Sequence, residues 1–74
     1  MWVQGQDGVV LVYCSGFIIS EARDCFELMG VQVGSADGIC LAIYSDPLEA
    51  LEEITNISAA IEDGVKIYRI GENE

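Results

Sequence analysis

The sequence has no histidine and little positive charge. Because histidine is the side chain that most often exchanges a proton near neutral pH, Ser–His and Cys–His catalytic pairs cannot form within this chain. Three Lys and Arg residues stand against 13 Asp and Glu residues, for a net charge of −10. The chain therefore has no basic track for nucleic-acid phosphates and no attraction to an anionic membrane. We expect no enzymatic activity, no direct binding of nucleic acid and no membrane contact.

Cysteines are few and irregularly spaced. Cys14, Cys25 and Cys40 form an odd set without a Cys-x-x-Cys pair, which is a poor framework for disulfides or for zinc. The opening residues show no basic segment followed by an apolar run, and no apolar stretch approaches the ~20 residues that span a bilayer. We therefore expect a protein of the reducing cytoplasm that carries no metal and no other cofactor.

The length of the chain suits one small domain. It has 74 residues, of which 51% are hydrophobic, and this fraction is too high for a disordered chain. We predict a single α+β domain over residues 1–74, with residues 71–74 as a frayed acidic tail.

The first 45 residues alternate between short apolar runs and turn signals. Two Asp-Gly pairs, Asp7-Gly8 and Asp37-Gly38, supply the positive φ angles that tight hairpins need, and Gly30 marks a bulge or break within a run. The pattern predicts an antiparallel meander of four or five short strands. The apolar runs that would form these strands are residues 2–5, 9–14, 17–19, 25–33 and 39–44.

After Tyr44 the pattern changes to that of a helix over residues 47–63. Asp46 is placed to cap it, Pro47 suits its first turn and Gly64 suits its end. At 100° per residue one apolar face would pack on one face of the sheet, and residues 65–70 would add a short final strand. That face comprises Ala50, Leu51, Ile54, Ile57 and Ile61, and the opposite, polar face comprises Glu49, Glu52, Glu53, Asn56 and Asp63.

Most of the hydrophobic core is expected to come from large apolar side chains of these strands and of the helix. The predicted core consists of Trp2, Leu11, Phe17, Ile19, Phe26, Leu28, Leu41, Ile43, Leu51, Ile54, Ile57, Ile61 and Ile67.

Glu49, Glu52 and Glu53 are neighbours on the outer helix face. An acid–base dyad or a cation site needs such pairs, but acids in the first helix turns also stabilise the helix dipole and keep the surface soluble. We interpret the three as a solvated acidic surface, on which Glu53→Ala would leave stability unchanged. The same surface supports an alternative function, an acidic inhibitor or nucleic-acid mimic that binds the basic site of a protein.

Two strands are apolar on both faces, although a single helix can cover only one face. Either the sheet curls and covers itself, or a partner covers it. We favour the partner and predict a non-catalytic protein-interaction module that self-associates as a homodimer. Its candidate interface residues are Val10, Val12, Cys40, Ala42, Tyr44 and Tyr68.

Two segments resemble a known group of proteins. Residues 1–7, Met-Trp-Val-Gln-Gly-Gln-Asp, resemble the Met-Trp-Ile-x-x-Gln-Asp opening of a family of small uncharacterised proteins from Firmicutes, their phages and their mobile elements. Residues 41–45 running into residues 50–54 are similar to the family's Tyr-containing strand that enters an Ala-Leu-Glu helix. The resemblance implies a bacterial α+β protein and brings no assigned activity or catalytic residue. This chain is more acidic than the family.

Overall fold

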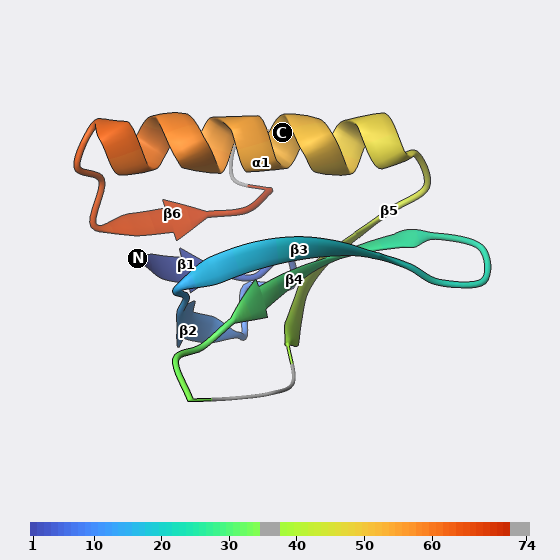
Figure 1. The fold of residues 1–74 in the computed structure, drawn as a ribbon, viewed down its shortest axis with the longest axis horizontal. Helices are drawn as coiled ribbons and strands as arrows, with labels where there is room; N and C mark the ends of the chain where they lie inside the picture. Colours follow the sequence, from blue (N-terminus) through green and yellow to red (C-terminus); the bar gives the residue numbers. More distant parts are fainter. Residues whose placement is uncertain (35–37, 72–74) are drawn as a thin grey trace.

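The computed structural model describes residues 1–34 and 38–71, and in these residues six short strands and one helix form an α+β fold (Figure 1). The predicted class is therefore confirmed. The elements, in chain order, are β1 (Trp2–Gln4), β2 (Leu11–Tyr13), β3 (Gly16–Glu21), β4 (Phe26–Val31), β5 (Ile39–Tyr44), α1 (Pro47–Glu62) and β6 (Ile67–Arg69).

The strands form two three-stranded sheets instead of the single sheet predicted. Sheet A has the order β2-β1-β6, and sheet B has the order β3-β4-β5. Sheet B is the expected antiparallel meander, but in sheet A strand β6 pairs with β1 in parallel, with Tyr68 opposite Val3. The prediction of one antiparallel sheet is therefore wrong. A parallel pair needs a long connection instead of a hairpin, and between β1 and β6 that connection contains all of sheet B and the helix.

The two sheets are hydrogen-bonded to each other at two places. Where β2 leads into β3, the Ser15 N–H donates to the Val31 carbonyl oxygen at 2.7 Å. On the other side, the Gln6 N–H donates to the Leu41 carbonyl oxygen at 2.7 Å, and the Gln6 Oε1 accepts from the Ile43 N–H at 3.1 Å. The strands therefore curl around a shared interior, which was one of the two alternatives that the sequence left open.

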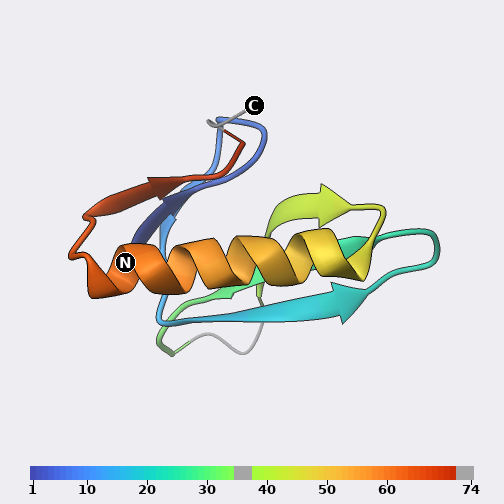
Figure 2. The ribbon, with the colours of Figure 1, turned by 90° about the horizontal axis from the view of Figure 1, so that it is seen from above.

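Helix α1 packs on sheet B and runs lengthwise between β6 on one side and β3 on the other (Figure 2). Asp46 caps it as predicted, with Oδ1 accepting from the Leu48 N–H at 2.9 Å, and Pro47 occupies the first turn. Beyond its last turn, Gly64 has a φ of 74°, which is the left-handed conformation expected of a helix-ending glycine. The helix start and end predicted from the sequence are confirmed to within one residue.

The buried face of the helix is rotated from the predicted one. Ala50, Ile57 and Ala60 are buried, because the small alanines let the helix backbone lie close to the sheet. Leu51 and Ile61, which we placed in the core, are exposed. Glu53, which we placed on the outer face, is half-buried.

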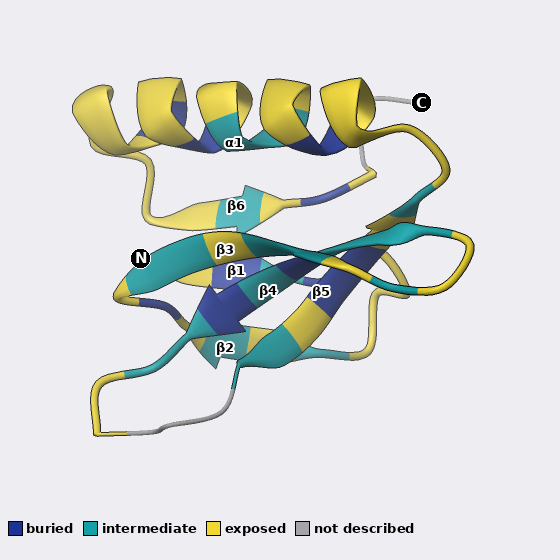
Figure 3. Cartoon of the chain, turned by 45° about the vertical axis from the view of Figure 1, so that its right-hand side comes forward, coloured by how far each residue is buried: buried dark blue, intermediate teal, exposed yellow. Residues whose placement is uncertain are grey.

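The core is smaller than predicted and lies between the sheets and beneath the helix (Figure 3). It is made of Val3, Cys14, Leu28, Leu41, Ala42, Ile57 and Ile70. Side chains alternate between the two faces of a strand, so the prediction had to choose which large residues of sheet A point inward. The prediction placed six residues in the core that are in fact exposed: Trp2, Leu11, Ile43, Leu51, Ile61 and Ile67.

Two predicted turns and the predicted tail have separate outcomes. Asp7-Gly8 makes the turn between β1 and β2, with Gly8 at a φ of 76° and the Asp7 carboxylate accepting from the Val9 N–H at 2.9 Å. Asp37 of the second pair and residues 72–74 of the tail lie outside the described residues.

Gly30 has a packing role instead of marking a bulge. The register irregularity between β4 and β5 falls at Leu28/Met29, not at Gly30. A Cβ atom on Gly30 would lie 2.6 Å from the Cys14 Sγ and 3.0 Å from the Leu41 Cδ1. Glycine is therefore needed here because two buried side chains occupy the space of a methyl group.

We predict that Gly30→Ala lowers the free energy of unfolding by about 1–3 kcal/mol, the usual cost of an overpacked core. The matched control is Gly16→Ala, also in a strand, where an added Cβ meets nothing within 4 Å. Urea unfolding followed by circular dichroism measures both. Equal stabilities of the two variants would contradict this packing role.

Candidate functional site

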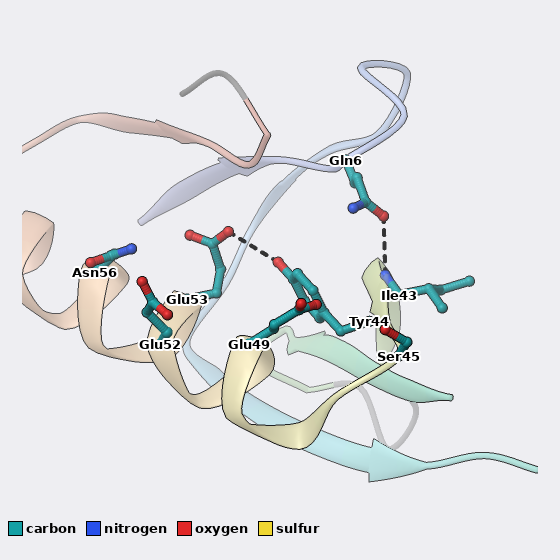
Figure 4. Close-up of a pocket in the computed structure, with 8 residues that line it drawn as sticks. All are labelled: Gln6, Ile43, Tyr44, Ser45, Glu49, Glu52, Glu53 and Asn56. Carbon is teal, nitrogen blue, oxygen red and sulfur yellow. Dashed lines mark hydrogen bonds between the residues drawn. The ribbon is translucent and has the colours of Figure 1, made fainter. Parts of the chain in front are cut away.

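One carboxylate connects three elements that are distant in sequence. Glu53 of α1 accepts a hydrogen bond from the Tyr44 hydroxyl of β5 at 3.0 Å on Oε1, and a second from the Tyr68 hydroxyl of β6 on Oε2. All three side chains are half-buried. Figure 4 shows Glu53 and Tyr44 pointing toward each other across the space between the helix and β5. This Glu53 cluster thus ties the helix both to sheet B and to sheet A.

Burial raises the pKa of both tyrosines well above the ordinary value, and the hydrogen bond to Glu53 raises it further. A phenolate beside the carboxylate would be repelled, so each hydroxyl keeps its proton and remains a donor. The two hydroxyls therefore do not exchange protons near neutral pH. The Glu53 cluster therefore has the properties of a structural link and not of an acid–base pair.

A shallow pocket of about 420 Å³ opens beside this cluster (Figure 4). Two of its carboxylates, Glu49 and Glu52, are exposed, and no basic residue is among those that line it. Its chemistry is that of hydrogen-bond acceptors, which suits donor groups and positive charge. The lining residues are Gln6, Ile43, Tyr44, Ser45, Glu49, Glu52, Glu53 and Asn56.

The predicted acidic surface is therefore only partly correct in its placement. The structure brings Glu49, Glu52 and Glu53 together around this pocket. Glu53, however, is half-buried and already holds two hydroxyls, so it does not belong to a solvated face. The 100° periodicity could not show this, because Tyr44 and Tyr68 reach Glu53 only after the chain has folded.

The predicted interface does not form one exposed surface. Ala42 is only 3% exposed and belongs to the core, so it is unavailable to a partner, which corrects that part of the prediction. Cys40 is exposed on β5. The remaining four residues are partly buried and pack against the core: Val10, Val12, Tyr44 and Tyr68.

The outer face of sheet A is a surface that the sequence did not reveal. Val3, Val12 and Tyr68 point inward, so their neighbours point outward. Trp2 and Tyr13 stack edge to face there, with ring centroids 5.4 Å apart. This surface would have been predicted if the inward and outward positions of each strand had been exchanged, which is a shift of one residue in the alternation. The face consists of Trp2, Gln4, Leu11, Tyr13, Ile67 and Arg69.

The three cysteines are free, and Cys14 and Cys40 are unlike activated nucleophiles. Burial raises the pKa of the buried Cys14 thiol. Desolvation, followed by the nearby Glu27 carboxylate, raises the pKa of Cys40. A raised pKa leaves less reactive thiolate at neutral pH. Within residues 1–34 and 38–71, no group of three or more His, Cys, Asp or Glu side chains is arranged to hold a metal ion.

No protein-family model, no curated protein and no solved structure matches the sequence. The resemblance to the Firmicutes and phage family therefore stays a prediction. Among the described residues, no helix is both long and apolar enough to span a membrane.

We predict that Glu53→Ala destabilises the fold, contrary to the expectation from the sequence. Two hydroxyls lose a charged acceptor, and a hydrogen bond to a charged group contributes about 1.5–3 kcal/mol. Glu52→Ala, one residue along the helix and exposed, should stay within about 0.5 kcal/mol of the wild type. Urea unfolding of both variants decides between the two descriptions of Glu53. If both substitutions changed the free energy of unfolding equally little, Glu53 would belong to the solvated face after all.

We also predict that the tyrosines make the fold less stable in alkaline solution. Their folded-state pKa values lie above the unfolded value of about 10, so the stabilisation is complete below pH ~10 and is lost as pH rises above it. The free energy of unfolding should therefore fall more steeply between about pH 9 and 11 in the wild type than in Tyr44→Phe/Tyr68→Phe. The cysteines contribute equally to both proteins. Parallel pH profiles would contradict the two hydrogen bonds.

Proposed function

We propose that this chain is a non-catalytic protein-interaction module of the cytoplasm that self-associates. The observation that carries the proposal is the large amount of apolar surface left in water. Among the described residues, twelve large hydrophobic side chains are exposed, and they lie on the helix, on the strands and in the turns. Exposed apolar surface that gathers into patches is typical of proteins that bury it against a partner.

The chemistry of the polar groups supports a role without catalysis. The half-buried carboxylate of Glu53 is occupied by two tyrosine hydroxyls that keep their protons. The thiols of Cys14 and Cys40 have raised pKa values. The three free cysteines also fit the reducing conditions of the cytoplasm.

The alternative function, an acidic inhibitor or nucleic-acid mimic, has weaker support. A mimic of duplex DNA needs negative charges spread over an extended surface, about one per 1.7 Å of axis. Here the exposed Glu49 and Glu52 lie together at one pocket, and Glu53 is engaged within the fold. Binding to a basic protein partner through this pocket stays a prediction.

We expect the molar mass measured by light scattering to rise with protein concentration from 8.0 kDa toward twice that value. Two copies that each carry a charge of −10 repel one another, so added salt should strengthen the association. A complex held by opposite charges would respond to salt in the reverse direction. A mass of 8.0 kDa at every concentration up to 1 mM, in low and in high salt, would overturn the proposed self-association.

A further inference from the structure

We infer that two copies of this chain associate through the outer face of sheet A, stacked face to face around a two-fold axis. The inference rests on the proposed self-association and assigns it to one surface.

The outer face of sheet A is a continuous surface made by all three of its strands. Trp2 of the central strand lies between Tyr13 on one side and Ile67 on the other. In the next row Gln4 lies between Leu11 and Arg69. The exposed fractions of the four apolar side chains are 44% for Trp2, 53% for Tyr13, 51% for Leu11 and 38% for Ile67.

Charge makes a second copy a suitable occupant of this face. Each chain carries a net charge of −10, so two copies can approach closely only where acidic side chains are missing. Of the six residues on the outer face of sheet A, none is acidic and Arg69 is basic. This face thus lacks the carboxylates that would repel one another at other contacts, and its one charged side chain, Arg69, is exposed at the end of β6.

Most of the other exposed apolar residues lie beside acids or in turns, and Ile18 of β3, which is opposite Met29, lies one row from Glu27. On the outer face of sheet B, Ile43 is opposite Glu27, and the carboxylate of Glu27 also raises the pKa of the Cys40 thiol. On the helix, Leu48 and Leu51 alternate with Glu49 and Glu52. Docking two copies on either surface would bring like charges together in a desolvated contact.

The size of the face sets the strength expected of the contact. An aromatic side chain presents about 150–250 Å², so the half-exposed Trp2 and Tyr13 together leave on the order of 200 Å² in water. With Leu11, Ile67 and the polar rim, the contact falls below the ~800 Å² per partner of a standard stable interface. It therefore suits a reversible dimer whose dissociation constant is micromolar or higher. Tyrosine and tryptophan are also the residues that contribute most to such contacts.

The test compares one glutamate placed on each sheet. Leu11→Glu on sheet A and Ile18→Glu on sheet B introduce the same charge at strand positions that are 51% and 54% exposed. A two-fold contact meets each substitution twice, so Leu11→Glu should raise the dimer dissociation constant at least about 10-fold. Ile18→Glu should leave it within about 2-fold. Light scattering and sedimentation give the constants, and thermal unfolding confirms that both variants are folded.

A second measurement needs no substitution. When the wild type is diluted from 1 mM to 20 µM, we expect amide resonances in β1, β2 and β6 to shift, while those of β3 and α1 stay constant. A dimer that is broken by Ile18→Glu and not by Leu11→Glu, or shifts confined to sheet B or the helix, would overturn this assignment and leave the self-association standing. A monomer at every concentration would remove the proposed function itself.

Discussion

The carboxylate of Glu53 is the contact that joins the helix to both sheets at once. Sheet B and the helix are close in sequence, but β6 returns to sheet A only after the helix has crossed the molecule. Through Tyr44 and Tyr68 a single side chain holds both sheets to the same helix turn. Because the helix has only three buried residues, this polar link supplements a small apolar contact. Glu53 is thus an acidic residue that stabilises the fold, as Asp7 and Asp46 do through their own hydrogen bonds.

Local features of the fold could be read from the sequence because they depend on residues near one another. The cap at Asp46, the glycine after the helix and the Asp7-Gly8 turn follow from local backbone chemistry. The α+β class and β5, with both its ends, follow from the change in hydrophobic period. The parallel pairing of β6 with β1 has no such signal, because it joins opposite ends of the chain.

The candidate site was harder to predict, and β5 shows why. The register irregularity between Leu28 and Met29 leaves two successive residues, Leu41 and Ala42, both buried. Strict alternation would place one of them outside, and we chose Ala42 as an interface residue on that basis. In sheet A the same assumption hid Trp2 and Leu11, because inward and outward positions were both apolar. A chain that is apolar on both faces of its strands carries little information about which face is the interior.

The pairing of β1 with β6 also has a consequence for synthesis on the ribosome. Trp2 lies opposite Ile67, so the central strand of sheet A lacks one of its two partners until nearly all of these residues have been made. During that time β1 can pair only with β2, and a lone two-stranded hairpin is marginally stable in water. Sheet B and the start of the helix are complete earlier and can fold first. A nascent chain would therefore acquire its aromatic surface in final form only at the last step, when the two ends of the molecule meet.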